Sequence, residues 1–218
     1  MLLLAIDTSA SAVTVALHDG TRVVAEAFEE SPQAHGERLA PQVQQVLREA
    51  GATPADLTSV AVGIGPGPYT GLRVGIVTGK VMAYALAIPV GGVCSLDALA
   101  WLAVRTKTVA GAFAVATDAR RKEVYLARYD ADAVRLSGPD VLRPGDVAAE
   151  VRTGPVVGAG LYPELFTHLL GPTRVTGGAV AAYAVGVLHA GYELADPTPM
   201  YLRRPDAVPS VASKTVLQ

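Results

Sequence analysis

Cysteine is nearly absent from this 218-residue chain, in which Cys94 is the single example. One cysteine excludes an intramolecular disulfide framework and a zinc site built from several thiolates. Charged residues make up only 17% of the chain, whereas hydrophobic residues make up 50%. Such a chain folds, because it has enough apolar surface to offset the loss of conformational entropy. The lack of disulfides predicts a protein of the reducing cytoplasm.

An excess of either charge is also absent. Lys and Arg total 18 and Asp and Glu total 20, which gives a net charge of −2. This balance argues against a protein whose own electric field captures nucleic acid. Residues 1–100 hold five basic and nine acidic side chains, whereas residues 101–218 hold 13 and 11. The change of sign predicts a domain boundary near residue 105.

Long hydrophobic runs are missing as well. The apolar start of the chain has no basic segment before it, and Asp7 ends it early, so it is typical of a buried strand rather than a signal peptide. The longest uncharged stretch near the middle, residues 81–96, is broken by Pro89 and by two glycines. A bilayer span needs about 20 apolar residues, and we expect no contact with membranes.

The order of periodic segments predicts an α/β protein. In the first half we expect strands at residues 2–8, 12–17, 22–28 and 57–64, and helices at 39–50 and 70–87. In the second half we expect strands at residues 112–117, 123–129, 134–142 and 156–160, and helices at 162–170 and 179–190. The second half therefore weakly echoes the first.

The two helices of the first half have unusual faces. The first carries one apolar stripe, and the second repeats small residues every four positions, which permits close approach of another backbone. Because the second helix is apolar nearly all round, it is buried on more than one side. Either both sides pack within the chain, or one meets a second subunit. The candidate interface residues are Leu39, Val43, Val46, Leu47, Gly71, Leu72, Gly75, Gly79, Met82 and Ala83.

A Gly/Pro-rich loop at residues 63–71 invites a nucleotide-binding interpretation, which the spacing does not support. A dinucleotide fingerprint would need glycine where Pro68 stands, and a P-loop would need Ser or Thr where Val81 follows Lys80. The loop is either a rigid strand-to-helix turn or a backbone surface for a ligand or partner. Asp7, Thr8 and Ser9 are candidates for a degenerate nucleotide site, although such residues are also ordinary turn formers.

Other chemical signatures are weak. The four histidines show no pair at helical metal-ligand spacing, and Leu39 stands four residues after His35, so we expect no metal site. No serine lies in a nucleophile elbow, and Cys94 has no evident histidine partner. The basic run Arg120-Arg121-Lys122 is either a solvated hairpin turn or a contact for RNA or a partner protein.

Five segments together resemble the TsaB (YeaZ) family over nearly the whole chain. They are Leu4-Ala5-Ile6-Asp7-Thr8-Ser9, His35-Gly36-Glu37-Arg38-Leu39 with Pro41, Gly63-Ile64-Gly65-Pro66-Gly67-Pro68-Tyr69-Thr70-Gly71-Leu72-Arg73, Asp118-Ala119-Arg120-Arg121 with Glu123-Val124-Tyr125, and Pro199-Met200-Tyr201-Leu202-Arg203. The resemblance implies an actin-like ATPase (ASKHA, ribonuclease H-like) fold of two related α/β lobes. We expect an N-terminal lobe at residues 1–105 with the dimerisation helices, and a smaller lobe at 106–218 whose C-terminal tail returns to the first.

The resemblance also implies a function. TsaB proteins are non-catalytic partners of TsaD, which transfers threonylcarbamoyl to adenosine in tRNAs that read codons beginning with A. They pair with TsaD or with themselves through N-lobe helices, TsaE joins the assembly, and this chain lacks the His-x-x-x-His metal motif of TsaD. We therefore expect no catalytic residue, no cofactor except ATP at a shared interface, and only indirect contact with tRNA. Two alternatives are an ATP-dependent phosphotransferase that uses Asp7 and Thr8, and a peptidase that acts on TsaD.

Overall fold

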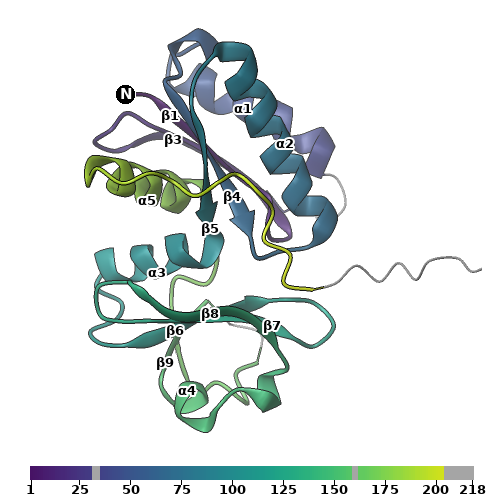
Figure 1. Cartoon of the computed structure of the whole chain (residues 1–218), viewed down its shortest axis with the longest axis vertical. Helices are drawn as coiled ribbons and strands as arrows, with labels where there is room; N and C mark the ends of the chain where they lie inside the picture. Colours follow the sequence, from purple (N-terminus) through teal and green to yellow (C-terminus); the bar gives the residue numbers. More distant parts are fainter. Residues whose placement is uncertain (31–34, 159–161, 204–218) are drawn as a thin grey trace, which may run out of the picture.

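The computed structural model describes residues 1–30, 35–158 and 162–203, and its first sheet is built from the N-terminal half (Figure 1). The strand order is β3-β2-β1-β4-β5. β1, β4 and β5 run parallel to one another, and β2 runs antiparallel to both of its neighbours. These strands are β1 (Leu3–Asp7), β2 (Ala12–His18), β3 (Val23–Glu30), β4 (Ser59–Gly65) and β5 (Val90–Cys94).

The second sheet repeats this arrangement. Its order is β10-β9-β6-β7-β8, with β6, β9 and β10 parallel and the β6-β7-β8 meander antiparallel. These strands are β6 (Phe113–Asp118), β7 (Val124–Tyr129), β8 (Arg135–Leu142), β9 (Pro155–Val157) and β10 (His168–Leu170). Both sheets thus have the mixed order of ribonuclease H-like domains, and the predicted actin-like fold of two related α/β lobes is confirmed.

Helices divide the molecule into layers (Figure 1). α1 and α2 cover the outer face of the first sheet, and α5 covers its inner face. α3 packs between α5 and the second sheet, whose outer face is covered by the short α4 and a turn. The helices are α1 (His35–Glu49), α2 (Tyr69–Leu86), α3 (Ser95–Arg105), α4 (Ala149–Thr153) and α5 (Gly177–His189), with 3-10 turns η1 (Pro54–Asp56) and η2 (Pro144–Asp146). Among these described elements, no helix is long and apolar enough to cross a bilayer.

The glycines of α2 bring this helix unusually close to the first sheet. A Cβ on Gly75 would lie 2.5 Å from Thr8 Oγ1, and a Cβ on Gly79 would overlap Val62 Cγ1. Thr8 binds the helix directly, because its hydroxyl donates to the Gly71 carbonyl at 2.7 Å and accepts from the Gly75 N–H at 3.0 Å. The repeat of small residues therefore serves packing within the chain.

Two parts of the chain differ from the sequence prediction. The helix expected at residues 162–170 is wrong, because the chain there forms a turn that buries Phe166 and then strand β10, paired in parallel with β9. β5 and α3 were not predicted, since Gly91 and Gly92 weaken the strand pattern. Those glycines make room for the C-terminal segment: a Cβ on Gly91 would overlap Leu194, and Gly92 forms a two-bond bridge with Ala195.

The C-terminal segment thus lies against the first lobe. Beyond the bridge to β5, the Met200 N–H donates to the Ile64 carbonyl at 2.8 Å. α5 also packs on the first sheet, although it follows the second sheet in sequence. The division of the chain at residue 105 stays a prediction, with α5 and the segment after it contacting the N-terminal lobe.

Candidate partner-docking face and interlobe cleft

The outer side of α2 carries apolar side chains that nothing in the described chain covers. Val77, Val81 and Tyr84 are 56%, 61% and 90% exposed, and their spacing of four and three residues places them on one helical face. We call these three residues the α2 outer stripe. Contiguous exposed apolar surface on a protein usually marks an interaction site, and the stripe is therefore a candidate docking face.

A groove of about 430 Å³ borders the stripe where α2 begins, next to the start of α1. Gly36 of α1 and Tyr69, Arg73 and Val77 of α2 are among its lining residues. Because Gly36 has no side chain, the first turn of α1 leaves this groove open. The groove lies at the N-terminal end of α2 and shares Val77 with the stripe.

The interface residues predicted from the sequence lie mostly on the other side of these helices. Nine of the ten are buried in the core of the first lobe, and Met82 alone is half-buried. These buried side chains are not open to a partner in this structure, and the location of the interface stays a prediction. The exposed side of α2 is the outer stripe. The signal for it was present in the sequence, because Val77, Val81 and Tyr84 lie opposite the glycine repeat. The nine buried residues are Leu39, Val43, Val46, Leu47, Gly71, Leu72, Gly75, Gly79 and Ala83.

A cleft of about 500 Å³ lies between the two lobes. Ser9 and Ser95 line it from the first lobe, and Asp118, Tyr125 and Arg174 line it from the other side. Its volume is within the usual range for small-molecule sites, roughly 300–1,000 Å³. The groups expected to face a phosphate, however, are largely turned inward.

Asp7 is sealed beneath the cleft by two serines. Its Oδ1 accepts the Ser9 N–H at 2.7 Å and the Ser9 hydroxyl at 2.6 Å, while its Oδ2 accepts the Ser95 hydroxyl at 2.6 Å. Desolvation raises the pKa of Asp7 despite these hydrogen bonds, which act in the opposite direction. Asp7 and Thr8 are both engaged within the protein, so of the three predicted nucleotide-site residues only Ser9 lines the cleft.

A second aspartate occupies the matching position in the second lobe. Asp118 ends β6 as Asp7 ends β1, and it lines the cleft beside Arg120. Asp118 Oδ1 accepts the Arg120 N–H at 2.8 Å, and Oδ2 lies 3.7 Å from the Arg120 guanidinium. The turn that follows holds Arg120, Arg121 and Lys122 at φ values of 61°, 56° and 60°. Left-handed backbone costs a residue with a Cβ roughly 1–2 kcal/mol, so this turn is a strained feature.

A polar cluster joins α3 to the second sheet. Tyr129 donates its hydroxyl proton to Asp97 at 2.8 Å, and the Arg135 guanidinium lies 3.4 Å from the same carboxylate. Desolvation raises the pKa of Asp97, and Arg135 opposes that shift. Burial also raises the pKa of the neighbouring Cys94 thiol to about 12, which leaves little thiolate at neutral pH. The sequence could not pair Asp97 with Tyr129, because 32 residues separate them.

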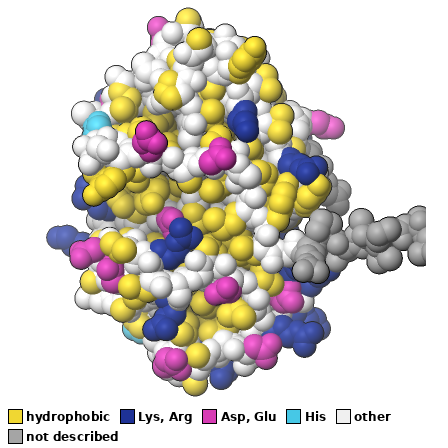
Figure 2. Space-filling view, in the orientation of Figure 1, with side chains coloured by type: hydrophobic (Ala, Val, Ile, Leu, Met, Phe, Trp, Pro, Cys, Tyr) yellow, Lys and Arg dark blue, Asp and Glu magenta, His cyan; other side chains and the backbone are white. Residues whose placement is uncertain are grey.

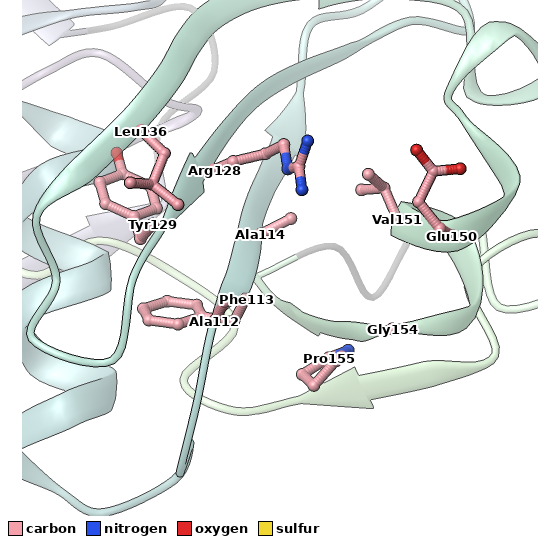
Figure 3. A pocket seen from close by; sticks show the side chains of 10 residues that line it. All are labelled: Ala112, Phe113, Ala114, Arg128, Tyr129, Leu136, Glu150, Val151, Gly154 and Pro155. Atoms are coloured by element: carbon pink, nitrogen blue, oxygen red, sulfur yellow. The ribbon is translucent and has the colours of Figure 1, made fainter.

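A smaller pocket lies in the second lobe, between β6, β7 and α4 (Figure 3). Its volume is about 80 Å³, room for a few water molecules at about 30 Å³ each. Arg128 extends from β7 toward the side of the pocket where Glu150 of α4 lies. Within the described ranges, no group of three or more His, Cys, Asp or Glu side chains is placed to hold a metal ion.

Known proteins resemble the chain in sequence and in structure. Residues 26–159 match the family model described as TsaD, tRNA N6-adenosine threonylcarbamoyltransferase. An uncharacterized protein of Mycobacterium tuberculosis is 42% identical over 94% of this chain and 93% of its own length. The tRNA threonylcarbamoyladenosine biosynthesis protein TsaB of Escherichia coli is 41% identical over 61% of this chain and 56% of its own length, slightly more than half.

The solved structure of YeaZ from Pseudomonas aeruginosa matches the fold closely. Its TM-score is 0.77 at 32% sequence identity, and the alignment covers 92% of this chain and 99% of that one. A second structure from that organism, an uncharacterized protein similar to the peptidase YeaZ, has a TM-score of 0.79, with 93% and 99% covered. These similarities extend over both lobes. The chain therefore belongs to the TsaB (YeaZ) family.

Proposed function

We propose that this protein is the non-catalytic partner of TsaD in the biosynthesis of threonylcarbamoyladenosine in tRNAs that read codons beginning with A. Relatives named TsaB and the match to the TsaD family model support this role. The observation that carries it is the α2 outer stripe, which offers apolar surface to a partner. The helix pair would dock against TsaD and hold the catalytic subunit in its active form, in the cytoplasm.

The arrangement of polar groups at the cleft supports a non-catalytic role. A phosphotransferase would need Asp7 and Thr8 to face its substrate, and both are buried and hydrogen-bonded within the first lobe. A peptidase would need an activated nucleophile, whereas the Ser9 hydroxyl donates to Asp7 and lies 2.9 Å from the Ser95 hydroxyl. We assign no cofactor to the chain alone and leave ATP to an interface shared with TsaD.

The docking geometry follows from the helix pair. α1 and α2 of this chain and the corresponding helices of TsaD would form a four-helix contact, and stable interfaces bury on the order of 1,600 Å². In the absence of TsaD the same apolar surface would pair two copies of this chain, which gives a homodimer. TsaE would join the TsaD complex, and tRNA would be held chiefly by the partners.

Introducing charge into the stripe tests this proposal. We expect Val77→Asp/Val81→Asp to lose co-purification with TsaD and to abolish formation of the modified nucleoside in a reconstitution from purified components. The matched control is Val134→Asp/Leu136→Asp on the second lobe, where the side chains are 59% and 58% exposed. This control should still co-purify with TsaD and support formation of the modified nucleoside. Circular dichroism should show both variants folded, because all four positions are open to solvent.

Full modification with the stripe variant, or with this protein omitted, would contradict the proposal. Equal loss in the control variant would assign the effect to charge rather than to the helix pair. Micromolar ATP binding with turnover by the isolated chain would instead favour the phosphotransferase alternative.

A further inference from the structure

Two exposed tyrosines stack at the edge of the first lobe. Tyr69 begins α2 and Tyr201 lies in the C-terminal segment, and their ring centroids are 4.8 Å apart. They are 45% and 39% exposed, so core packing does not account for them. The Arg73 guanidinium lies 3.9 Å from the Tyr69 centroid, and its Nε donates to the Tyr201 hydroxyl at 2.8 Å. Aromatic and guanidinium planes are thus held together at the surface.

A basic turn lies beside this stack. Arg203 follows Tyr201 by two residues and forms an ion pair with Glu123, which directly follows Arg120, Arg121 and Lys122. All three side chains are exposed at the β6–β7 turn. Glu123 pairs with Arg203, and Asp118 pairs with Arg120 of the turn itself. In Figure 2, Lys and Arg side chains gather at the right-hand side of the lower lobe, with a few acidic ones among them.

The backbone of the turn departs from the relaxed conformation. All three basic residues have positive φ. A glycine at any of these positions would adopt that φ without the steric cost that a Cβ brings. Strained backbone of this kind concentrates at functional sites. Arg121 and Lys122 are the central residues of a tight hairpin turn, which the Glu123 N–H closes by donating to the Arg120 carbonyl at 3.0 Å, and such turns need positive φ at both positions. The turn therefore places two basic side chains next to each other at the tip of the hairpin.

We propose that Tyr69, Arg73, Tyr201 and the turn Arg120, Arg121 and Lys122 form a surface that contacts RNA directly. Unpaired bases stack on aromatic rings and guanidinium planes, and phosphates pair with Arg and Lys. The stack supplies the first kind of contact and the turn supplies the second. The overall charge of −2 does not oppose this, because attraction at contact distance depends on local charge once salt screens the rest. The choice of tRNA as the RNA rests on the proposed function.

The test measures binding of a fluorescein-labelled, unmodified tRNA transcript to the full chain by fluorescence anisotropy, at roughly 50–200 mM salt. We expect Arg121→Gln/Lys122→Gln to weaken binding about tenfold and to lower the slope of log affinity against log salt by about 1.5, the effect of losing two phosphate contacts. Tyr201→Ala should weaken binding by a similar factor through lost stacking. Tyr201→Phe keeps the ring and should bind within about twofold of the unchanged chain.

Arg105→Gln/Lys107→Gln, at the end of α3, removes the same charge elsewhere and is the matched control. Equal weakening by this control, or unchanged binding in the turn variant, would overturn the proposal. Loss of TsaD co-purification by the turn variant with RNA binding intact would also overturn it, in favour of a protein contact. Failure of the docking proposal has a different signature, because the stripe variant Val77→Asp/Val81→Asp should still bind RNA.

Discussion

The two sheets share one strand order, and each central strand ends in an aspartate that points to the same region of the molecule. Asp7 is buried under Ser9 and Ser95, whereas Asp118 lines the cleft and pairs with Arg120. The repeated topology determines where each carboxyl group lies. Its neighbours determine whether that group is sealed or accessible, so the fold alone does not make the cleft an ATPase site.

The outer faces of the sheets differ even more. The first is covered by α1 and α2, which span 15 and 18 residues, whereas the second has α4 of five residues and a turn. The long helices can bury one side in the core and still present another side to a partner. The proposed division of labour follows: the first lobe docks, and the second lobe supports the cleft and carries the basic turn.

The largest effect is expected from a side chain placed between α2 and the first sheet, where the glycines of the helix bring the two close together. We expect Gly79→Leu to destabilise the fold by about 3 kcal/mol or more, because even its Cβ would overlap Val62 and the helix would have to move. Chemical denaturation should show the loss as a lower midpoint. Gly36→Ala is the control, since nothing lies within 4 Å of its new Cβ, and it should be neutral or slightly stabilising.

A normally stable Gly79→Leu protein that fails only to bind TsaD would contradict the packing and restore the glycine repeat as the interface. That outcome was the expectation from the sequence alone. The repeat predicted a close backbone approach but could not identify which neighbour came close.

The rest of the fold was predictable to the extent that its signals were local. The strands and helices of the first half up to residue 87 follow apolar periodicity and are confirmed. β5 was not predicted, because Gly91 and Gly92 are explained only by Leu194 and Ala195, about 100 residues later. The sequence predicts a helix where the turn before β10 lies, and this prediction is wrong because strands of only three residues leave almost no apolar pattern. Likewise the Asp7 site depends on Ser95, 88 residues away.

The polar cluster between α3 and the second sheet tests how far the two lobes depend on each other. Asp97→Ala removes the partner of Tyr129 and of Arg135. We expect a cost of about 2 kcal/mol, below the 3–5 kcal/mol of fully buried pairs, because the Arg135 side chain is 33% exposed. Denaturation followed by tyrosine and tryptophan fluorescence should show one weakened transition.

The exposed ion pair between Glu29 and Arg38 is the matched control for that change. Glu29→Ala should alter the free energy of unfolding by no more than about 0.5 kcal/mol. Two separate transitions in Asp97→Ala would show that the lobes unfold independently once the cluster is removed. A cost equal to that of Glu29→Ala would mean that the cluster does not hold the lobes together.

We expect the smallest effect, a change in the pH dependence of stability, from Asp7, the buried carboxyl group of the first lobe. Because burial raises the pKa of Asp7, its contribution to stability is complete below its ordinary pKa of 3.8 and is lost as pH rises through the higher folded-state value. Asn does not titrate, so Asp7→Asn should gain stability relative to the unchanged protein from acid to neutral pH. Denaturation midpoints measured across that range give the sign.

Asp19, in the turn after β2, supplies the opposite case. The Thr21 hydroxyl and the N–H groups of Thr21 and Arg22 hold its pKa below the ordinary value, so its contribution is present at neutral pH and lost as pH falls. Asp19→Asn should therefore be less stable than the unchanged protein at neutral pH and approach it in acid. If both variants drift in the same direction with pH, the changes reflect total charge, and the sealed environment of Asp7 is not what separates the two lobes.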